Sequence, residues 1–301
     1  MSFVRRKKTN DRDINAVISA LDELDARQKN DLESRLAQIH ELVGTAAYRC
    51  RNSDDALEFL RKAFPAEDCR DPISAYEQIA LCDEYLTAFP YSAEFRRELF
   101  FGSSEPYRDE ASGRIEYIGN NYTDEAFRCF SDKLGIKNAL IVSSFEELCE
   151  DVYSGNSEYG ILPVENTDNG KLLRFYSLIN RYDLKIISVC SVSTSDSGST
   201  SFALIRKSIE YPNVNFDKPD MLEFLVKPGR NGSLLQILTA ARFCSMDIYR
   251  IDSLPLSSID EEFTFCFVMK LNRESRIDPF LLYMSVDFPQ YTPLGIFKYI
   301  F

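Results

Sequence analysis

Residues 159–170 read YGILPVENTDNG. An apolar run followed by polar residues and a glycine is typical of a buried strand that opens into a loop at its C-terminal end. In open α/β sheets, ligands lie at that end of the strands. Glu165, Asn166 and Thr167 would bring a carboxylate, an amide and a hydroxyl there. The alternative is that these three residues only cap and turn the chain into the next helix.

The sequence around this stretch alternates between strand and helix patterns. Predicted strands cover 115–119, 138–142, 159–164 and 184–192, and predicted helices cover 123–134 and 171–181. Another helix is expected after Ser144, which with Glu147 has the spacing of a capping box. Such alternation predicts a mainly parallel sheet.

The stretch 144–170 resembles the first lobe of prephenate dehydratase, a family that places a Pro-(Ile/Val)-Glu-Asn-(Ser/Thr) loop against its substrate. The resemblance implies a periplasmic-binding-protein-like α/β domain over residues 115–210 and a substrate site that includes Glu165, Asn166 and Thr167.

A second part of the resemblance lies at residues 117–126, which are similar to the family's opening Tyr-x-Gly loop in a shortened form. It implies that Asn121, Tyr122 and Thr123 contribute to substrate binding on the side of the cleft opposite Glu165.

Residues 193–199 stand where the family has an entire second lobe, so this lobe is expected to be mostly absent. Thr200 and Phe202 match the family's Thr-Arg-Phe strand, but Ser201 replaces the arginine. The resemblance implies that the threonine hydroxyl assists departure of the ring hydroxyl and that Phe202 lines the substrate site. Because that chemistry requires a rigid, water-poor cleft, we favour a structural role for Thr200 as a β-branched residue at a strand start.

The C-terminal part, residues 220–301, has a strand-helix-strand-strand-helix-strand pattern. Its six pieces are predicted at 222–227, 232–244, 247–254, 263–271, 279–286 and 294–300, and they suit a ferredoxin-like βαββαβ fold. The motifs of this part resemble the ACT domain that binds phenylalanine in the same family. The implied effector-binding residues are Gly232, Ser233, Leu234, Asp252 and Ser253. A glycine at a helix start exposes backbone N–H groups to a carboxylate, and Asp252 would meet an ammonium group. The alternative is that Gly232 only opens a helix and Asp252 faces solvent.

Residues 1–100 are predicted to be helical, with helices over about 12–49, 54–64 and 72–89. The pattern Leu21 to Asp25 followed by Arg35 resembles the chorismate mutase domain that is often fused ahead of the dehydratase. Ile18 and Ala46 occupy positions where that family has cations, so we expect no mutase activity. A linker is expected at 101–114.

The composition of the chain argues against several classes of function. The formal charge is −12 with a pI near 4.8, which argues against nucleic acid or an anionic membrane as a partner. No stretch of about 18 apolar residues is present, the N-terminus lacks the pattern of a signal peptide, and the eight cysteines are scattered. We therefore expect a cytoplasmic protein with buried free thiols. The sequence contains a single histidine, His40, which argues against most catalytic mechanisms that depend on histidine.

Taken together, the sequence predicts an α+β multidomain protein with three parts at 1–100, 115–210 and 220–301. Family resemblance implies a role in phenylalanine biosynthesis, a homodimer, and no metal or organic cofactor. Three functions stay open. They are a dehydratase of weakened or lost activity, a non-catalytic protein that senses an aromatic amino acid or partners an active homologue, and a remnant without ligand.

Overall fold

The computed structural model describes ten single positions between Ser19 and Glu41 together with residues 53–63, 72–88, 113–193, 198–208, 221–227, 234–255, 263–288 and 290–300. Side chains at the ends of the first two segments, at 53–54, 63, 72–74 and 88, are not described. Most of the predicted linker at 101–114 and most of the predicted long helix lie outside the described residues, and so do Gly232 and Ser233.

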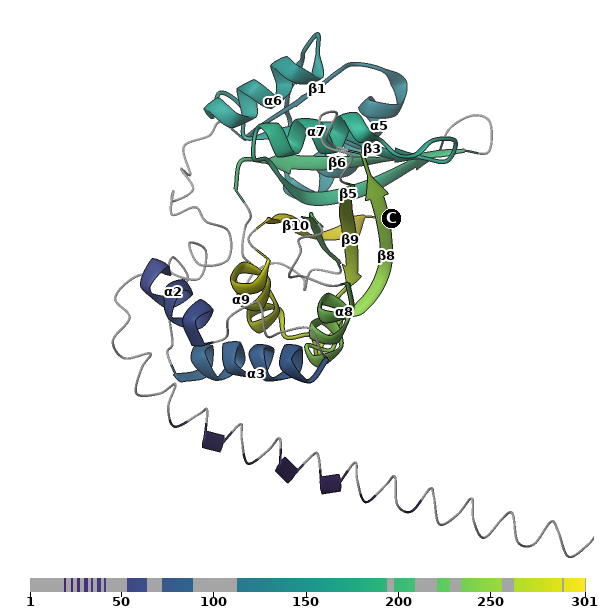
Figure 1. Ribbon diagram of the computed structural model, residues 1–301. Coiled ribbons are helices and arrows are strands. Elements are labelled where there is room, and N and C mark those ends of the chain that lie inside the picture. Colours follow the sequence, from purple (N-terminus) through teal and green to yellow (C-terminus); the bar gives the residue numbers. More distant parts are fainter. Residues whose placement is uncertain are drawn as a thin grey trace, which may run out of the picture.

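The N-terminal part contains the two shorter helices that the sequence predicted, α2 (Ser53–Ala63) and α3 (Pro72–Ala88). The ten described positions between Ser19 and Glu41 are helical and exposed. Helix α3 lies across two helices of the C-terminal half, and all of them share one hydrophobic core (Figure 1). An ion pair between Asp83 and Arg276 also joins them. The helical part therefore packs onto the C-terminal half.

The first half of the α/β region follows the predicted order, with boundaries shifted by a few residues. Its elements are β1 (Arg114–Tyr117), α5 (Asn121–Leu134), β2 (Asn138–Ile141), α6 (Phe145–Ser154), β3 (Tyr159–Asn166), β4 (Gly170–Lys171), α7 (Leu173–Arg181), β5 (Lys185–Ser193) and β6 (Ser199–Arg206). Ser144 caps α6 as predicted, by accepting a hydrogen bond from the Glu147 N–H at 3.1 Å. The Glu147 carboxylate accepts from Ser143 instead of completing a box with Ser144.

The second half has the elements β7 (Met221–Val226), α8 (Leu234–Phe243), β8 (Asp247–Leu254), β9 (Thr264–Lys270), α9 (Ile277–Asp287) and β10 (Tyr291–Ile300). Its strands lie in the order β10-β7-β9-β8, with antiparallel neighbours throughout. This order and the two helices are those of a split βαβ arrangement.

Both halves share one sheet, with the strand order β2-β1-β3-β6-β5-β10-β7-β9-β8 and β4 paired to β3. The joint is a parallel pair between β5 and β10. In Figure 1 the strands β3, β5 and β6 of the first half run across the view, and β8 and β9 of the second half run nearly down it. Gly295 lies at this joint, where an added Cβ would stand 2.3 Å from the Ile186 carbonyl oxygen. Only glycine allows the two backbones to approach so closely.

The predicted mainly parallel sheet is wrong in one respect, because the sheet is mixed. Strand β6 lies antiparallel between β3 and β5. It returns directly from β5 without a crossover helix, which makes an antiparallel pair the natural result.

Three cores hold these layers together. One lies between α5 and the first half of the sheet, and another lies under α8, α9, α2 and α3. The third joins the halves, because residues of α6 and α7 pack with the sheet face of the second half that its own helices leave open. None of the helices in the described part of the chain has the length and apolar character needed to cross a membrane.

Candidate functional site

A cleft of about 730 Å³ lies between the two halves. The first half lines it with Glu165, Asn166, Thr167, Lys171, Ser191, Ser199 and Ser201, and the second half lines it with Met221, Tyr249, Arg250, Val268, Lys270 and Tyr299. Hydroxyl groups come mainly from the first half, whereas the second half supplies two cations and most of the apolar surface. The cleft has the size of an ordinary small-molecule site.

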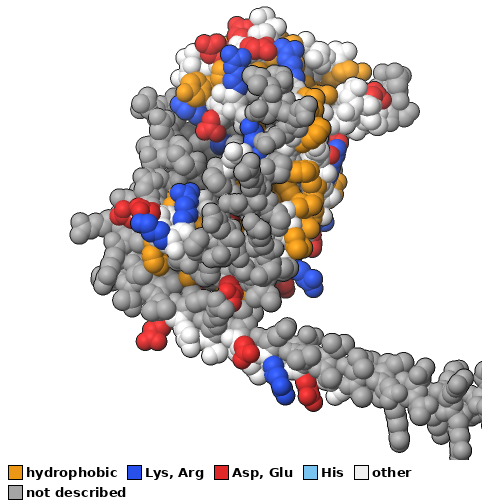
Figure 2. All heavy atoms as spheres, in the orientation of Figure 1, with side chains coloured by type: hydrophobic (Ala, Val, Ile, Leu, Met, Phe, Trp, Pro, Cys, Tyr) orange, Lys and Arg blue, Asp and Glu red, His pale blue; other side chains and the backbone are white. Residues whose placement is uncertain are grey.

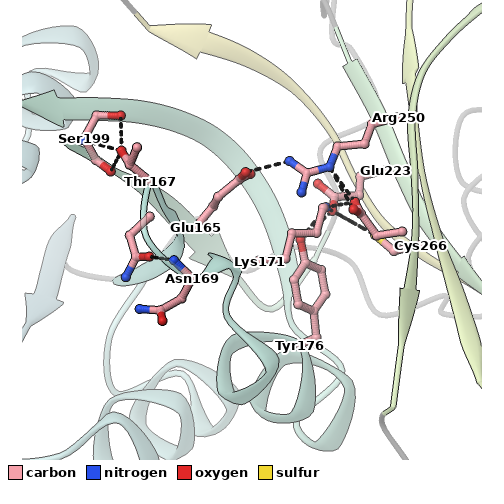
Figure 3. Close-up of polar contacts among 11 residues, drawn as sticks. Glu165, Thr167, Asn169, Lys171, Tyr176, Ser199, Glu223, Arg250 and Cys266 are labelled. Atoms are coloured by element: carbon pink, nitrogen blue, oxygen red, sulfur yellow. Dashed lines mark hydrogen bonds and ion pairs between the residues drawn. The ribbon is translucent and has the colours of Figure 1, made fainter.

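Glu165 extends from the end of β3 across the cleft to the second half (Figure 3). Its Oε1 accepts a hydrogen bond of 2.6 Å from Arg250 Nη1. Arg250 Nε donates to Asp252 Oδ1 at 2.9 Å, so one guanidinium serves two carboxylates. Burial alone would lower the pKa of Arg250, but its hydrogen bonds to Glu165 and Asp252 raise it above its ordinary value.

A buried cluster lies behind this bridge. The Lys171 ammonium contacts Glu223 Oε1 at 2.5 Å, the Tyr176 hydroxyl at 2.6 Å and Cys266 Sγ at 3.4 Å. Tyr176 and Cys266 both donate to the same Glu223 oxygen. Lys171 and Tyr176 come from the first half, and Glu223 and Cys266 come from the second, so the cluster bonds the halves together.

The charges of the cluster stabilise one another despite their burial. Desolvation alone would raise the pKa of Glu223, but the Lys171 ammonium outweighs it and lowers that pKa. Desolvation would lower the pKa of Lys171, but Glu223 reverses the direction and raises it. Burial also raises the pKa of Cys266, which keeps this thiol protonated. Both members of the pair are therefore ionised at neutral pH.

Thr200 is not among the cleft residues. On β6 it pairs with Asn166 and Val192, whereas its neighbour Ser201 pairs with Glu165 and Ser191. Successive residues of a strand point to opposite faces of the sheet. Ser201 therefore faces the cleft with Glu165, and Thr200 faces the α5 side of the sheet, where Val192 is buried.

Phe202, also predicted at the substrate site, is 3% exposed in the core under α5. Its place on the buried face follows from the same alternation that turns Thr200 away from the cleft. The structure therefore does not bring the predicted catalytic residue together with Glu165.

Asn166 and Thr167 line the cleft, but their side chains also hold the local backbone. Asn166 Oδ1 accepts from the Asn169 N–H at 2.6 Å and closes the turn to β4. Thr167 Oγ1 bonds the N–H and C=O groups of Ser199, which fixes the start of β6. Asn166 and Thr167 therefore shape the local turn, as one of the two sequence interpretations expected, and they also line the cleft.

Asn121, Tyr122 and Thr123 form the first turn of α5 and do not line the cleft. Asn120 caps this helix and forms a capping box with Thr123. The Thr123 hydroxyl is buried and donates to the Ile118 carbonyl at 2.5 Å. Helix capping accounts for the polar pattern that resembled a substrate loop.

Of the effector residues expected in the second half, Leu234, Asp252 and Ser253 are among the described residues. Leu234 is 46% exposed at the start of α8, Ser253 is exposed on β8, and Gly232 and Ser233 lie outside the described residues. The Asp252 carboxylate forms an ion pair with Arg250 and is therefore not a free surface charge.

Sequence reasoning missed the second half's contribution to the cleft. Lys270 stands two residues from Val268 on β9, and Arg250 stands two residues from its partner Asp252 on β8. In the sequence, either cation can be taken for an ordinary surface charge. The sequence did contain a signal for the buried cluster at Glu223. A charged residue inside the otherwise apolar run MLEFLV requires a buried partner of opposite charge. Among the described residues, no group of three or more histidine, cysteine, aspartate or glutamate side chains is placed to hold a metal ion.

Residues 115–196 match the family model for prephenate dehydratase. No curated protein matches the chain in sequence.

Among solved structures, prephenate dehydratase from Streptococcus mutans aligns at 19% identity and a TM-score of 0.51, over 62% of this chain and 99% of that one. GqqA, described as a novel type of quorum-quenching acylase, aligns at 18% and 0.48, over 62% and 95%. Prephenate dehydratase from Arthrobacter aurescens, solved in complex with L-Phe, aligns at 12% and 0.48, over 62% and 90%. The likeness to the Streptococcus mutans protein is one of fold. Residues 115–196 of this chain thus match the prephenate dehydratase family model, as the motifs around Glu165 predicted.

Proposed function

We propose that this chain is a non-catalytic relative of the prephenate dehydratases that binds a small organic acid in the cleft between its two halves. The observation that carries the proposal is the register of β6, which pairs Ser201 with Glu165 and turns Thr200 to the opposite face. A hydroxyl on the wrong face of a sheet cannot reach a substrate held beside Glu165.

Loss of dehydration follows from the chemistry that remains. The reaction implied by the family needs a hydroxyl at the leaving group and a cation for a carboxylate, both in fixed positions. Ser201 replaces the expected arginine, and the Arg250 guanidinium is already bound to two carboxylates, those of Glu165 and Asp252. Because Thr200 also faces away from the cleft, the hydroxyl that would assist the leaving group is not in position for dehydration.

Binding requires less of the site. Hydroxyls of Ser191, Ser199 and Ser201 can donate to an acid, and Lys270 supplies a positive charge. Met221 and Val268 provide apolar surface beside them. An apolar wall with a few converging polar groups is the usual composition of a small-molecule site.

The proposal is tested by assaying phenylpyruvate formation from prephenate and, in parallel, thermal melting with a panel of small aromatic acids. We expect no phenylpyruvate above the uncatalysed rate, and a rise in Tm with at least one acid because a ligand that binds only the folded state stabilises it. Phenylpyruvate formation that is lost in Thr200→Ala would establish a dehydratase. A Tm that none of the acids changes would remove the binding function.

A second proposal concerns assembly and regulation. The edge strand β8 exposes Ile248, Tyr249 and Ile251, and Figure 2 shows apolar side chains gathered along that side of the molecule. An exposed apolar edge strand favours pairing with another chain. We infer a homodimer through this ACT-like half, which can also hold an effector near Leu234. Light scattering at micromolar concentration tests it, and a monomer would contradict it.

We further propose that the helical part has no chorismate mutase activity and serves to cover α8 and α9. Chorismate consumption that is abolished by Arg35→Ala would contradict this. The six described cysteines are free, which suits the reducing cytoplasm.

A further inference from the structure

Two charged side chains on opposite walls of the cleft keep spare bonding capacity. Glu165 uses Oε1 for Arg250, and its Oε2 accepts no hydrogen bond from any described residue. Lys270 is exposed, and its ammonium forms no ion pair within the described part of the chain. Lys171, by contrast, directs its donors to Tyr176, Glu223 and Cys266.

The charge count on the Glu165 side is unbalanced. Three carboxylates, those of Glu165, Glu223 and Asp252, face two cations, Lys171 and Arg250, which leaves one negative charge. Asp252 Oδ2 lies close to both cations, 2.8 Å from Arg250 Nε and 3.8 Å from Lys171 Nζ, whereas Glu165 Oε2 accepts no hydrogen bond from the described residues. The open position for a positive group is therefore at Glu165.

The positive wall is close to the negative one. On the paired strands β8 and β9, Arg250 lies opposite Val268, and Lys270 is the next residue along the same face. Diagonal neighbours of this kind are about 7–8 Å apart, within reach of long side chains. Lys270 and the Glu165–Arg250 bridge can therefore converge on one small ligand.

We propose that the ligand of the cleft is a zwitterionic α-amino acid with an apolar or aromatic side chain. Its ammonium group binds Glu165 Oε2, and its carboxylate binds Lys270 and the hydroxyls of Ser191 and Ser201. The side chain packs against the apolar wall that includes Tyr249, which is 62% exposed. This inference rests on the function proposed above and names its ligand class.

Charge also excludes other ligands. The six groups Glu165, Glu223, Asp252, Lys171, Arg250 and Lys270 sum to zero. A dicarboxylate would bring two uncompensated negative charges, one of them towards the carboxylate of Glu165. A zwitterion leaves the sum at zero and matches the sign of each wall.

The experiment is a calorimetric titration of the full chain with L-Phe, L-Tyr and L-Leu and with the acid that lacks the amino group of each. For L-Phe this acid is 3-phenylpropionate. We expect at least one amino acid to bind tenfold more tightly than its deaminated acid. Glu165→Gln should remove that difference, and Lys270→Gln should weaken both ligands tenfold or more. Glu150→Gln and Lys133→Gln, on exposed helix positions, are matched controls that should change neither.

Each outcome decides the question. Equal binding of amino acid and deaminated acid by the unmodified chain would overturn this inference and leave acid binding intact. No binding of any ligand would overturn both proposals. Amino-acid binding that both cleft variants leave unchanged would place the ligand elsewhere and overturn the inference. The comparison on the unmodified chain stays decisive even if Glu165→Gln fails to fold.

Discussion

Glu165 and Arg250 lie 85 residues apart in the chain and meet through a hydrogen bond of 2.6 Å across the cleft. Glu165 belongs to the motif by which the prephenate dehydratase segment was recognised, and Arg250 belongs to the C-terminal half. The cation that Ser201 does not supply is therefore brought to Glu165 by another part of the chain. The C-terminal half forms a wall of the cleft in this protein.

We predict that Lys171→Met destabilises the fold strongly, by about 3–5 kcal/mol, because it leaves the Glu223 carboxylate buried without a cation. The double variant Lys171→Met/Glu223→Gln should recover most of the loss, since the neutral amide still accepts from Tyr176. Urea unfolding monitored by circular dichroism measures both. Lys133→Met, on an exposed position of α5, is the control, and equal effects of the single and double variants would contradict a coupled pair.

The same pair predicts the direction of a pH dependence. The pKa of Glu223 in the folded protein is lower than its ordinary value, so the folded state holds this proton less tightly than the unfolded state. The stabilisation is present above the ordinary glutamate pKa and is lost as pH falls through the lower folded value. Unfolding free energies measured at descending pH should therefore decrease more steeply for the unmodified chain than for Lys171→Met/Glu223→Gln.

Asp287 predicts a pH dependence of the opposite sign. It is 8% exposed on α9, and burial raises its pKa to about 7, although the Tyr283 hydroxyl acts in the other direction. Its contribution to stability is thus full at acidic pH and is lost as pH rises through about 7. The stability advantage of Asp287→Asn over the unmodified chain should be about 2–3 kcal/mol larger at pH 8 than at pH 5. A difference that does not change between these pH values would contradict the prediction.

Gly295→Ala should weaken the joint between the halves. The new methyl group would collide with the Ile186 carbonyl at the β5–β10 pair, and the backbone cannot move without breaking that pair. We expect a loss of about 2–4 kcal/mol by urea unfolding. Gly155→Ala is the comparison, because Gly155 has a φ of 76° and open space around it, so its cost is only about 1–2 kcal/mol of backbone strain. Equal losses would show that the joint tolerates the methyl group.

The sequence by itself determined the order and type of the elements. Alternation of period two and period 3.6 located most of the strands and helices from β1 to β10, but not β4, and local residues such as Ser144 fixed the cap of α6. The motif around Glu165 identified the family of residues 115–196. These features depend on neighbours within a few positions, which a sequence pattern records directly.

Tertiary structure alone decided which residues meet. A register shift between Pro163 and Glu165 pairs Ser201, and not Thr200, with Glu165, and no local pattern predicts where such an irregularity falls. The parallel joint of β5 and β10 places Arg250 and Lys270 over the cleft and seals Lys171 against Glu223. Charges so distant in sequence find partners only when long-range packing excludes water around them, because exposed pairs contribute little by themselves.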